Sequence, residues 1–104
     1  MGIKRSVLFL MLACCSCVSE VNKSKSAVLF TGKSLFIQRC ASCHGVNGGL
    51  QASASPDLRG SELSKLEIME MIENGGNGMP AFQTIITSLE EKRKIVDHVL
   101  TLKK

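Results

Sequence analysis

The 104-residue sequence predicts a small all-α protein with about three main helices. Apolar residues recur at helical spacing in three segments, and no segment shows the alternation of apolar and polar residues that is typical of a strand. Ser, Thr and Gly residues stand where these helices would begin and end. The predicted domain, residues 27–104, has fewer than about 80 residues, so an apolar core alone would be marginal and a further stabilising element is expected.

Residues 1–13 have the pattern of a secretory signal peptide. Lys4 and Arg5 precede an apolar stretch that is too short to span a bilayer. A cysteine directly after an apolar stretch and a small residue resembles the cleavage site of bacterial lipoproteins. We therefore expect Cys14 to carry a lipid, with Cys15 as the alternative acceptor; a secreted protein cut elsewhere is the other interpretation.

Residues 14–26 are predicted to form the lipid-anchor cysteine region and a flexible linker. Residues 18–26 are polar and lack periodicity. Nine flexible residues reach about 16 Å, which would keep the domain near a membrane surface. If Cys14 carries the lipid, Cys15 and Cys17 remain as spare thiols, and the sequence leaves open whether they are acylated, paired or inert.

The first helix is expected from about residue 27 to Arg39, with Ser26 as its N-cap. Leu35 and Phe36 fall on its apolar side. Gly32 is unusual inside a helix, because glycine costs about 1 kcal/mol relative to alanine there. Close packing against another helix would justify it; a break in the helix at Gly32 is the alternative.

The motif Cys40-Ala41-Ser42-Cys43-His44 has the spacing of a covalent attachment site for a c-type haem. Two thiols one helical turn apart can each add to a haem vinyl group, and the histidine that follows can coordinate the iron. Such an attachment suits a protein outside the cytoplasm. The haem would also be the stabilising element that the short domain requires.

Three other uses of these cysteines are weaker. A thioredoxin-like dithiol needs a βαβ context, which the helical pattern does not provide. A zinc site needs four ligands, and the sequence has no second pair near the motif. A structural disulfide between Cys40 and Cys43 is the remaining alternative.

The middle helix is bounded by a capping box of Ser64 and Glu67 and by Gly75. We expect Leu66, Met69 and Ile72 to form its buried face.

A glycine-rich run, residues 74–78, follows the middle helix and precedes Met79 and Pro80. Its glycines allow the backbone to approach the haem, and Pro80 restricts the residue before it. Met79 is therefore the candidate second iron ligand, and the alternative is a methionine on a surface loop. A thioether is a soft, neutral donor, so His/Met ligation would favour ferrous iron.

The final helix is expected to begin at Thr87 or Ser88 and to extend toward Leu102, with apolar residues at helical spacing. His98 would lie in a helix crossing as a neutral ring or be exposed; a role as a second iron ligand is the remote third option.

The segment from Gly32 to Gly45 is similar to the haem-binding segment of class I cytochromes c. The similarity continues through Pro56-Asp57-Leu58 and Gly78-Met79-Pro80-Ala81-Phe82 and covers about residues 27–102. It implies a small cytochrome c fold with loops wrapped around one covalent haem c. It also implies thioether bonds from Cys40 and Cys43 and axial ligation by His44 and Met79.

The same resemblance assigns further residues. The Pro56 carbonyl would accept a hydrogen bond from the ring of His44 and orient it. Leu58 would pack on the porphyrin, and Arg59 would reach a propionate unless it is an ordinary exposed arginine. Gly32 and Phe36 would lie where the first and last helices cross, and family members often carry an aromatic residue at the position of His98.

Together these features predict a single-electron carrier, not an enzyme, that passes electrons between redox partner proteins outside the cytoplasmic membrane. One rival is a haem peroxidase or diatomic-gas sensor with a labile Met79 bond. Nothing in the sequence supplies the polar residues that peroxidase chemistry requires beside the iron. Another rival is a haem subunit of a larger redox complex.

The charge of the chain gives a further hint about partners. The net charge is +4, and removing residues 1–13 with Lys4 and Arg5 leaves 11 basic and 9 acidic residues, a net +2. This balance does not indicate nucleic acid binding. The Lys92-Arg93-Lys94 cluster either steers an acidic redox partner or is a solvated helix face, and we favour the second.

Overall fold

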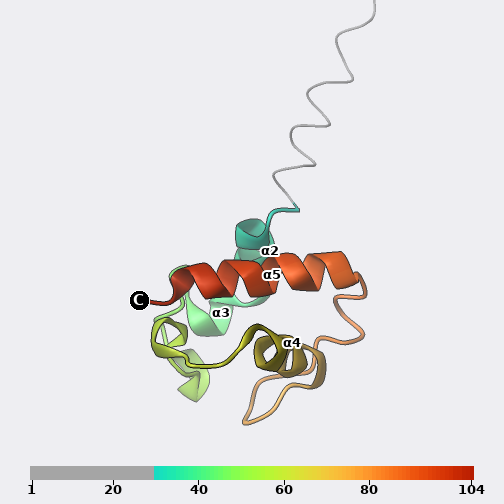
Figure 1. Cartoon of the computed structure of the whole chain (residues 1–104). Coiled ribbons are helices and arrows are strands. Elements are labelled where there is room, and N and C mark those ends of the chain that lie inside the picture. Colours follow the sequence, from blue (N-terminus) through green and yellow to red (C-terminus); the bar gives the residue numbers. More distant parts are fainter. Residues whose placement is uncertain (1–29) are drawn as a thin grey trace, which may run out of the picture.

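A computed structural model describes residues 30–104, which fold into helices joined by long loops (Figure 1). The helices of this range are α2 (Gly32–Arg39), α3 (Ala41–His44), α4 (Lys65–Asn74) and α5 (Leu89–Leu102), with short 3-10 turns at Ala52–Ala54 and Leu58–Gly60. Its only β-type pairing is an isolated bridge between Gly76 and Met79. The all-α fold class is confirmed. The expected signal peptide, the anchor region with Cys14 and the Ser26 cap lie outside the described residues.

Helix α5 crosses α2, and Gly32 allows the two backbones to touch (Figure 1). A Cβ atom at Gly32 would lie 2.1 Å from the carbonyl oxygen of Lys94, so only hydrogen fits there. Phe36 is fully buried in the same crossing, with its ring centroid 5.2 Å from that of His98. The close packing expected at Gly32 is therefore present.

The start of the first helix differs from the prediction. Thr31 is the N-cap, and its hydroxyl accepts a hydrogen bond from the backbone N–H of Ser34. Gly32 is consequently the first helical residue. The propensity penalty of glycine is an entropic cost that applies to helix interiors, so it is smaller at this end position.

Helix α4 has the predicted boundaries, and its buried face agrees with the prediction at Met69 and Ile72 but not at Leu66. Ser64 and Glu67 form the capping box, and Gly75 follows the last turn. The buried side chains are Ile68 and Ile72, with Met69 partly buried, whereas Leu66 is 81% exposed. Leu66 is two residues from Ile68, a rotation of about 200° around the helix, so the two side chains face opposite sides.

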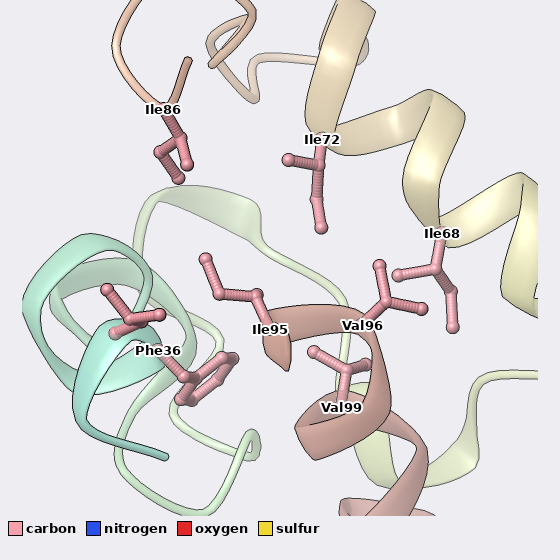
Figure 2. Close-up of a cluster of buried hydrophobic side chains, with 8 residues drawn as sticks. Phe36, Ile68, Ile72, Ile86, Ile95, Val96 and Val99 are labelled. Carbon is pink, nitrogen blue, oxygen red and sulfur yellow. The ribbon is translucent and has the colours of Figure 1, made fainter. Parts of the chain in front are cut away.

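The core is formed where α5 meets α2 and α4 (Figure 2). Helix α5 begins after its N-cap Ser88, as expected. The buried apolar residues of the described range come from α2, α4, α5 and the segment before α5: Leu35, Phe36, Ile68, Ile72, Ile86, Ile95, Val96 and Val99. Half-buried side chains from the loops, including those of Leu58 and Met79, pack against the same cluster.

Candidate haem site

The attachment motif occupies a single helical turn. Cys40 ends α2 and is also the N-cap of α3. Its carbonyl accepts hydrogen bonds from the N–H groups of Cys43 and His44, at 3.3 and 3.0 Å. The turn stops at Gly45, which has φ of +74° and where a Cβ atom would lie 2.7 Å from that of Leu50. The two sulfurs and the imidazole are therefore presented from one rigid turn.

Both cysteines of the motif are free, half-buried thiols. Burial raises the pKa of Cys40 to about 11, and the positive charge of Arg39 opposes this only in part. A reactive dithiol needs a thiolate near neutral pH. The environment of Cys40 thus argues against the thioredoxin-like interpretation, and the free sulfurs suit attachment to a cofactor.

His44 is buried, with 8% of its surface exposed. Burial lowers its pKa, and the backbone carbonyl of Pro56, acting as a hydrogen-bond acceptor, opposes that shift. The contact with Pro56 is loose, because Nδ1 of His44 is buried without a partner that meets normal hydrogen-bond geometry in the described residues. Burial favours the neutral imidazole, which is the form that binds metals. The carbonyl of Pro56 lies near this ring, and its role in orienting His44 stays a prediction.

The loop after α3 folds back over the motif. The N–H of Leu50 bonds to the carbonyl of His44 at 3.0 Å, and the N–H of Leu58 bonds to that of Gly48 at 2.9 Å. These bonds hold Leu58 half-buried against the core. Leu58 therefore presents an apolar side chain at the core, as its expected packing on the porphyrin requires.

Arg59 has a partner that the sequence did not reveal. Its guanidinium binds the Asp57 carboxylate through two hydrogen bonds, Nε to Oδ1 at 2.9 Å and Nη2 to Oδ2 at 2.7 Å. These bonds lower the pKa of Asp57 to about 2. The guanidinium also lies so close to Gly49 that a Cβ there would be 2.6 Å from it. The structure thus gives Arg59 an ion pair, and its contact with a propionate stays a prediction.

Met79 lies in a tight turn that follows α4. Gly76 and Met79 exchange two backbone hydrogen bonds, of 3.0 and 2.9 Å. Asn77 and Gly78 between them have φ of 51° and 89°, values typical of a type I′ turn. A Cβ at Gly75 would lie 2.4 Å from the carbonyl oxygen of Met79, so this glycine is required for the turn. The backbone therefore holds Met79 at one place against the core.

The described residues fit a covalent haem. Cys40, Leu58 and Met79 all pack around one apolar cluster, although they belong to three separate segments. His44 adds a buried neutral imidazole with an orphaned ring nitrogen. Two free thiols, one imidazole and one thioether are together the groups that hold haem c.

The basic cluster in α5 is not a free cationic patch. Lys92 is buried and binds the Glu73 carboxylate at 2.5 Å, and Lys94 pairs with Glu90 at 3.1 Å. Of the three residues, Arg93 alone is exposed without an ion pair in the described part of the chain. The pairing with Glu73 spans 19 residues and has no local signal in the sequence.

Residues 30–104 show neither a cluster of metal-binding side chains nor a helix that could cross a membrane. Within this range, no group of three or more His, Cys, Asp or Glu side chains is arranged to hold a metal ion. None of the helices there combines the length and hydropathy needed to cross a membrane.

Residues 27–99 match the protein family described as cytochrome c oxidase, cbb3-type, subunit III. Among solved structures, the chain is similar to the KustC0563 c-type cytochrome, with 27% sequence identity and a TM-score of 0.62. That similarity covers 71% of this chain and 99% of the other. No curated protein gives a significant match.

Proposed function

The chain belongs to the cytochrome c oxidase, cbb3-type, subunit III family, and we propose that its cytochrome c domain carries single electrons with His44 and Met79 as the axial iron ligands. The domain binds haem c covalently, and a cytochrome c domain exchanges electrons with redox partner proteins. Haem c supplies a one-electron couple at its iron.

The attachment turn is the observation that carries this proposal. Cys40 and Cys43 would form the two thioether bonds, and His44 on the same turn would bind the iron. The carbonyl of Pro56 would accept a hydrogen bond from the other nitrogen of His44, fix the orientation of the ring and increase its basicity. Leu58 would exclude water from this face.

Met79 is proposed as the ligand from the other loop because its backbone is fixed and its side chain is half-buried against the core. A neutral thioether stabilises ferrous iron more than a second imidazole would, so it raises the reduction potential. Ligation by both His44 and Met79 leaves no open iron position for a substrate. This supports a carrier and not a catalyst.

The rival peroxidase or gas sensor would need Met79 to leave the iron readily. His98, the other histidine of the chain, packs against Phe36 in the helix crossing and so is not available as a polar group beside the iron. Its position also removes the support for His98 as an iron ligand. The tight turn at Met79 further supports the carrier.

A second candidate is a haem subunit of a larger redox complex, because the description of the family names an oxidase subunit. A stable monomer with a reversible one-electron couple would contradict this candidate. In either case the domain would work outside the cytoplasmic membrane, where c-type cytochromes are typically found, and we propose lipid attachment at Cys14 as its tether.

Absorption spectra of the purified holoprotein test the proposal. We expect a covalent low-spin haem, a near-infrared sulfur-to-iron band in the oxidised state, and no reaction of the reduced form with carbon monoxide. Met79→Leu should lose the near-infrared band, and its reduced form should bind carbon monoxide. Met69→Leu, which changes a half-buried methionine on α4, is the control and should keep the band and not bind carbon monoxide. Ready carbon monoxide binding by the wild type would favour the sensor or peroxidase, and failure to attach haem would refute both functions.

A further inference from the structure

A buried ion pair joins the two ends of the loop that carries Met79. This loop, residues 75–88, connects α4 to α5 and is called the Met79 loop below. Glu73 lies in the last turn of α4 and Lys92 in the first turn of α5. The Nζ atom of Lys92 is 2.5 Å from Oε1 of Glu73, so the ion pair closes the loop at its base.

The Glu73–Lys92 ion pair differs from the other ion pairs of α5 in its burial. The side chain of Lys92 is 7% exposed and that of Glu73 is 24% exposed. The pair between Lys65 and Asp97 also joins α4 to α5, but its side chains are 57% and 58% exposed. Exposed pairs contribute little to stability, whereas removing one partner of a buried pair leaves an uncompensated charge.

The last turn of α4 controls the position of Met79 through the backbone. The N–H of Phe82 bonds to the carbonyl of Ile72 at 2.8 Å, and the N–H of Gly75 bonds to that of Met71 at the same distance. The turn from Gly76 to Met79 lies between these two bonds. A displacement of the last turn of α4 therefore displaces Met79.

We propose that the Glu73–Lys92 ion pair is a positioning element for Met79. By fixing the last turn of α4 to the first turn of α5, it limits opening of the Met79 loop and so keeps the thioether at the iron. This inference rests on Met79 being an axial ligand. Removing Lys92 from the ion pair leaves the partly buried Glu73 carboxylate without its partner. The molecule relieves this unpaired charge by opening the loop, and the released loop gains conformational entropy.

The test compares holoprotein variants by amide hydrogen exchange and by the near-infrared band. In Lys92→Met, we expect exchange of the Met79 and Phe82 amides to accelerate at least about tenfold relative to core amides of α5. The band should also disappear at a lower temperature than in the wild type. Lys65→Met, which breaks the exposed pair between the same helices, should change neither readout.

The double variant Lys92→Met/Glu73→Gln checks the physical cause. It removes the carboxylate that Lys92→Met leaves unpaired, so it should restore part of the slow exchange at Met79 and Phe82. Equal acceleration in the single and double variants would contradict an origin in the buried charge.

Two further results separate this inference from the proposed function. If Lys92→Met lowers the melting temperature while exchange at Met79 and Phe82 follows the rest of the protein, the ion pair is merely structural and the inference is wrong. If the wild type lacks the near-infrared band, ligation by Met79 is wrong. In that case, the ratio of amide exchange at Met79 and Phe82 to exchange at the core amides of α5 still shows whether the ion pair positions the loop. This ratio does not depend on ligation of the iron.

Discussion

Replacing Gly32 with alanine should destabilise the crossing of α2 and α5. The added methyl group would lie 2.1 Å from the carbonyl oxygen of Lys94 and 3.1 Å from Cβ of His98. The first contact is with backbone, which cannot rotate away as a side chain can. The two helices must therefore separate by about 1 Å to reach a normal contact distance.

The size of the effect follows from two opposing contributions. Overpacking in a core typically costs 1–3 kcal/mol, and contact with backbone favours the upper end. Alanine has a higher helix propensity than glycine by at most about 1 kcal/mol, and by less in the first turn. The net loss is about 2 kcal/mol, which corresponds to a fall in melting temperature of about 8–16 °C for a domain of this size.

Thermal unfolding of the holoprotein, followed by far-ultraviolet circular dichroism, measures this loss. Gly60→Ala is the matched control, because a Cβ at Gly60 has no heavy atom within 4 Å and the backbone there does not have positive φ. We expect Gly60→Ala to melt within about 2 °C of the wild type. If the melting temperature of Gly32→Ala equals that of Gly60→Ala, the helices are not in backbone contact and the reasoning about the crossing is refuted.

Three further changes test other parts of the domain. His98→Phe removes a ring nitrogen, Nε2, that is buried without a hydrogen-bond partner among residues 30–104, so the melting temperature should rise. Burial and the nearby charge of Lys33 lower the pKa of His98 in the folded state, so protonation of His98 favours the unfolded state. The free energy of unfolding of the wild type should therefore decrease as the pH falls below about 6.5, and it should decrease less in His98→Phe. Ser64→Ala removes the capping box of α4 and should cost about 1 kcal/mol in denaturant unfolding, whereas an unchanged midpoint would show that the cap is not needed. Cys40→Ser should leave one thioether, so the pyridine haemochrome spectrum should shift toward that of a haem with one free vinyl group; a wild-type spectrum would exclude Cys40 from attachment.

Local signals in the sequence predicted most of the helix boundaries. Ser64 and Glu67 act within one turn, so their capping box is readable without knowledge of the fold. The prediction of a close crossing at Gly32 is confirmed, but the predicted start of its helix is too early, because Thr31 is the N-cap. The spacing of Leu66 from Met69 and Ile72 predicted a buried Leu66, but the face of α4 that packs on the core carries Ile68 instead.

The ion pairs of the site could not be predicted in the same way. Glu73 and Lys92 meet only because α4 packs against α5, and no spacing in the sequence marks a contact over 19 residues. Asp57 and Arg59 are only two residues apart, yet their pairing depends on the local turn that begins at Asp57. The sequence therefore predicted the chemistry of the candidate site better than its electrostatics.

The position of Cys40 bears on the order in which this protein matures. Cys40 is the joint between α2 and α3, and the folded domain shields its sulfur as a neutral thiol. Partial burial and the raised pKa of Cys40 would both slow thioether formation in the folded domain, because the thiolate is the reactive form of cysteine. We therefore expect attachment to be faster before the domain folds, so that the final fold closes around a cofactor that is already bound.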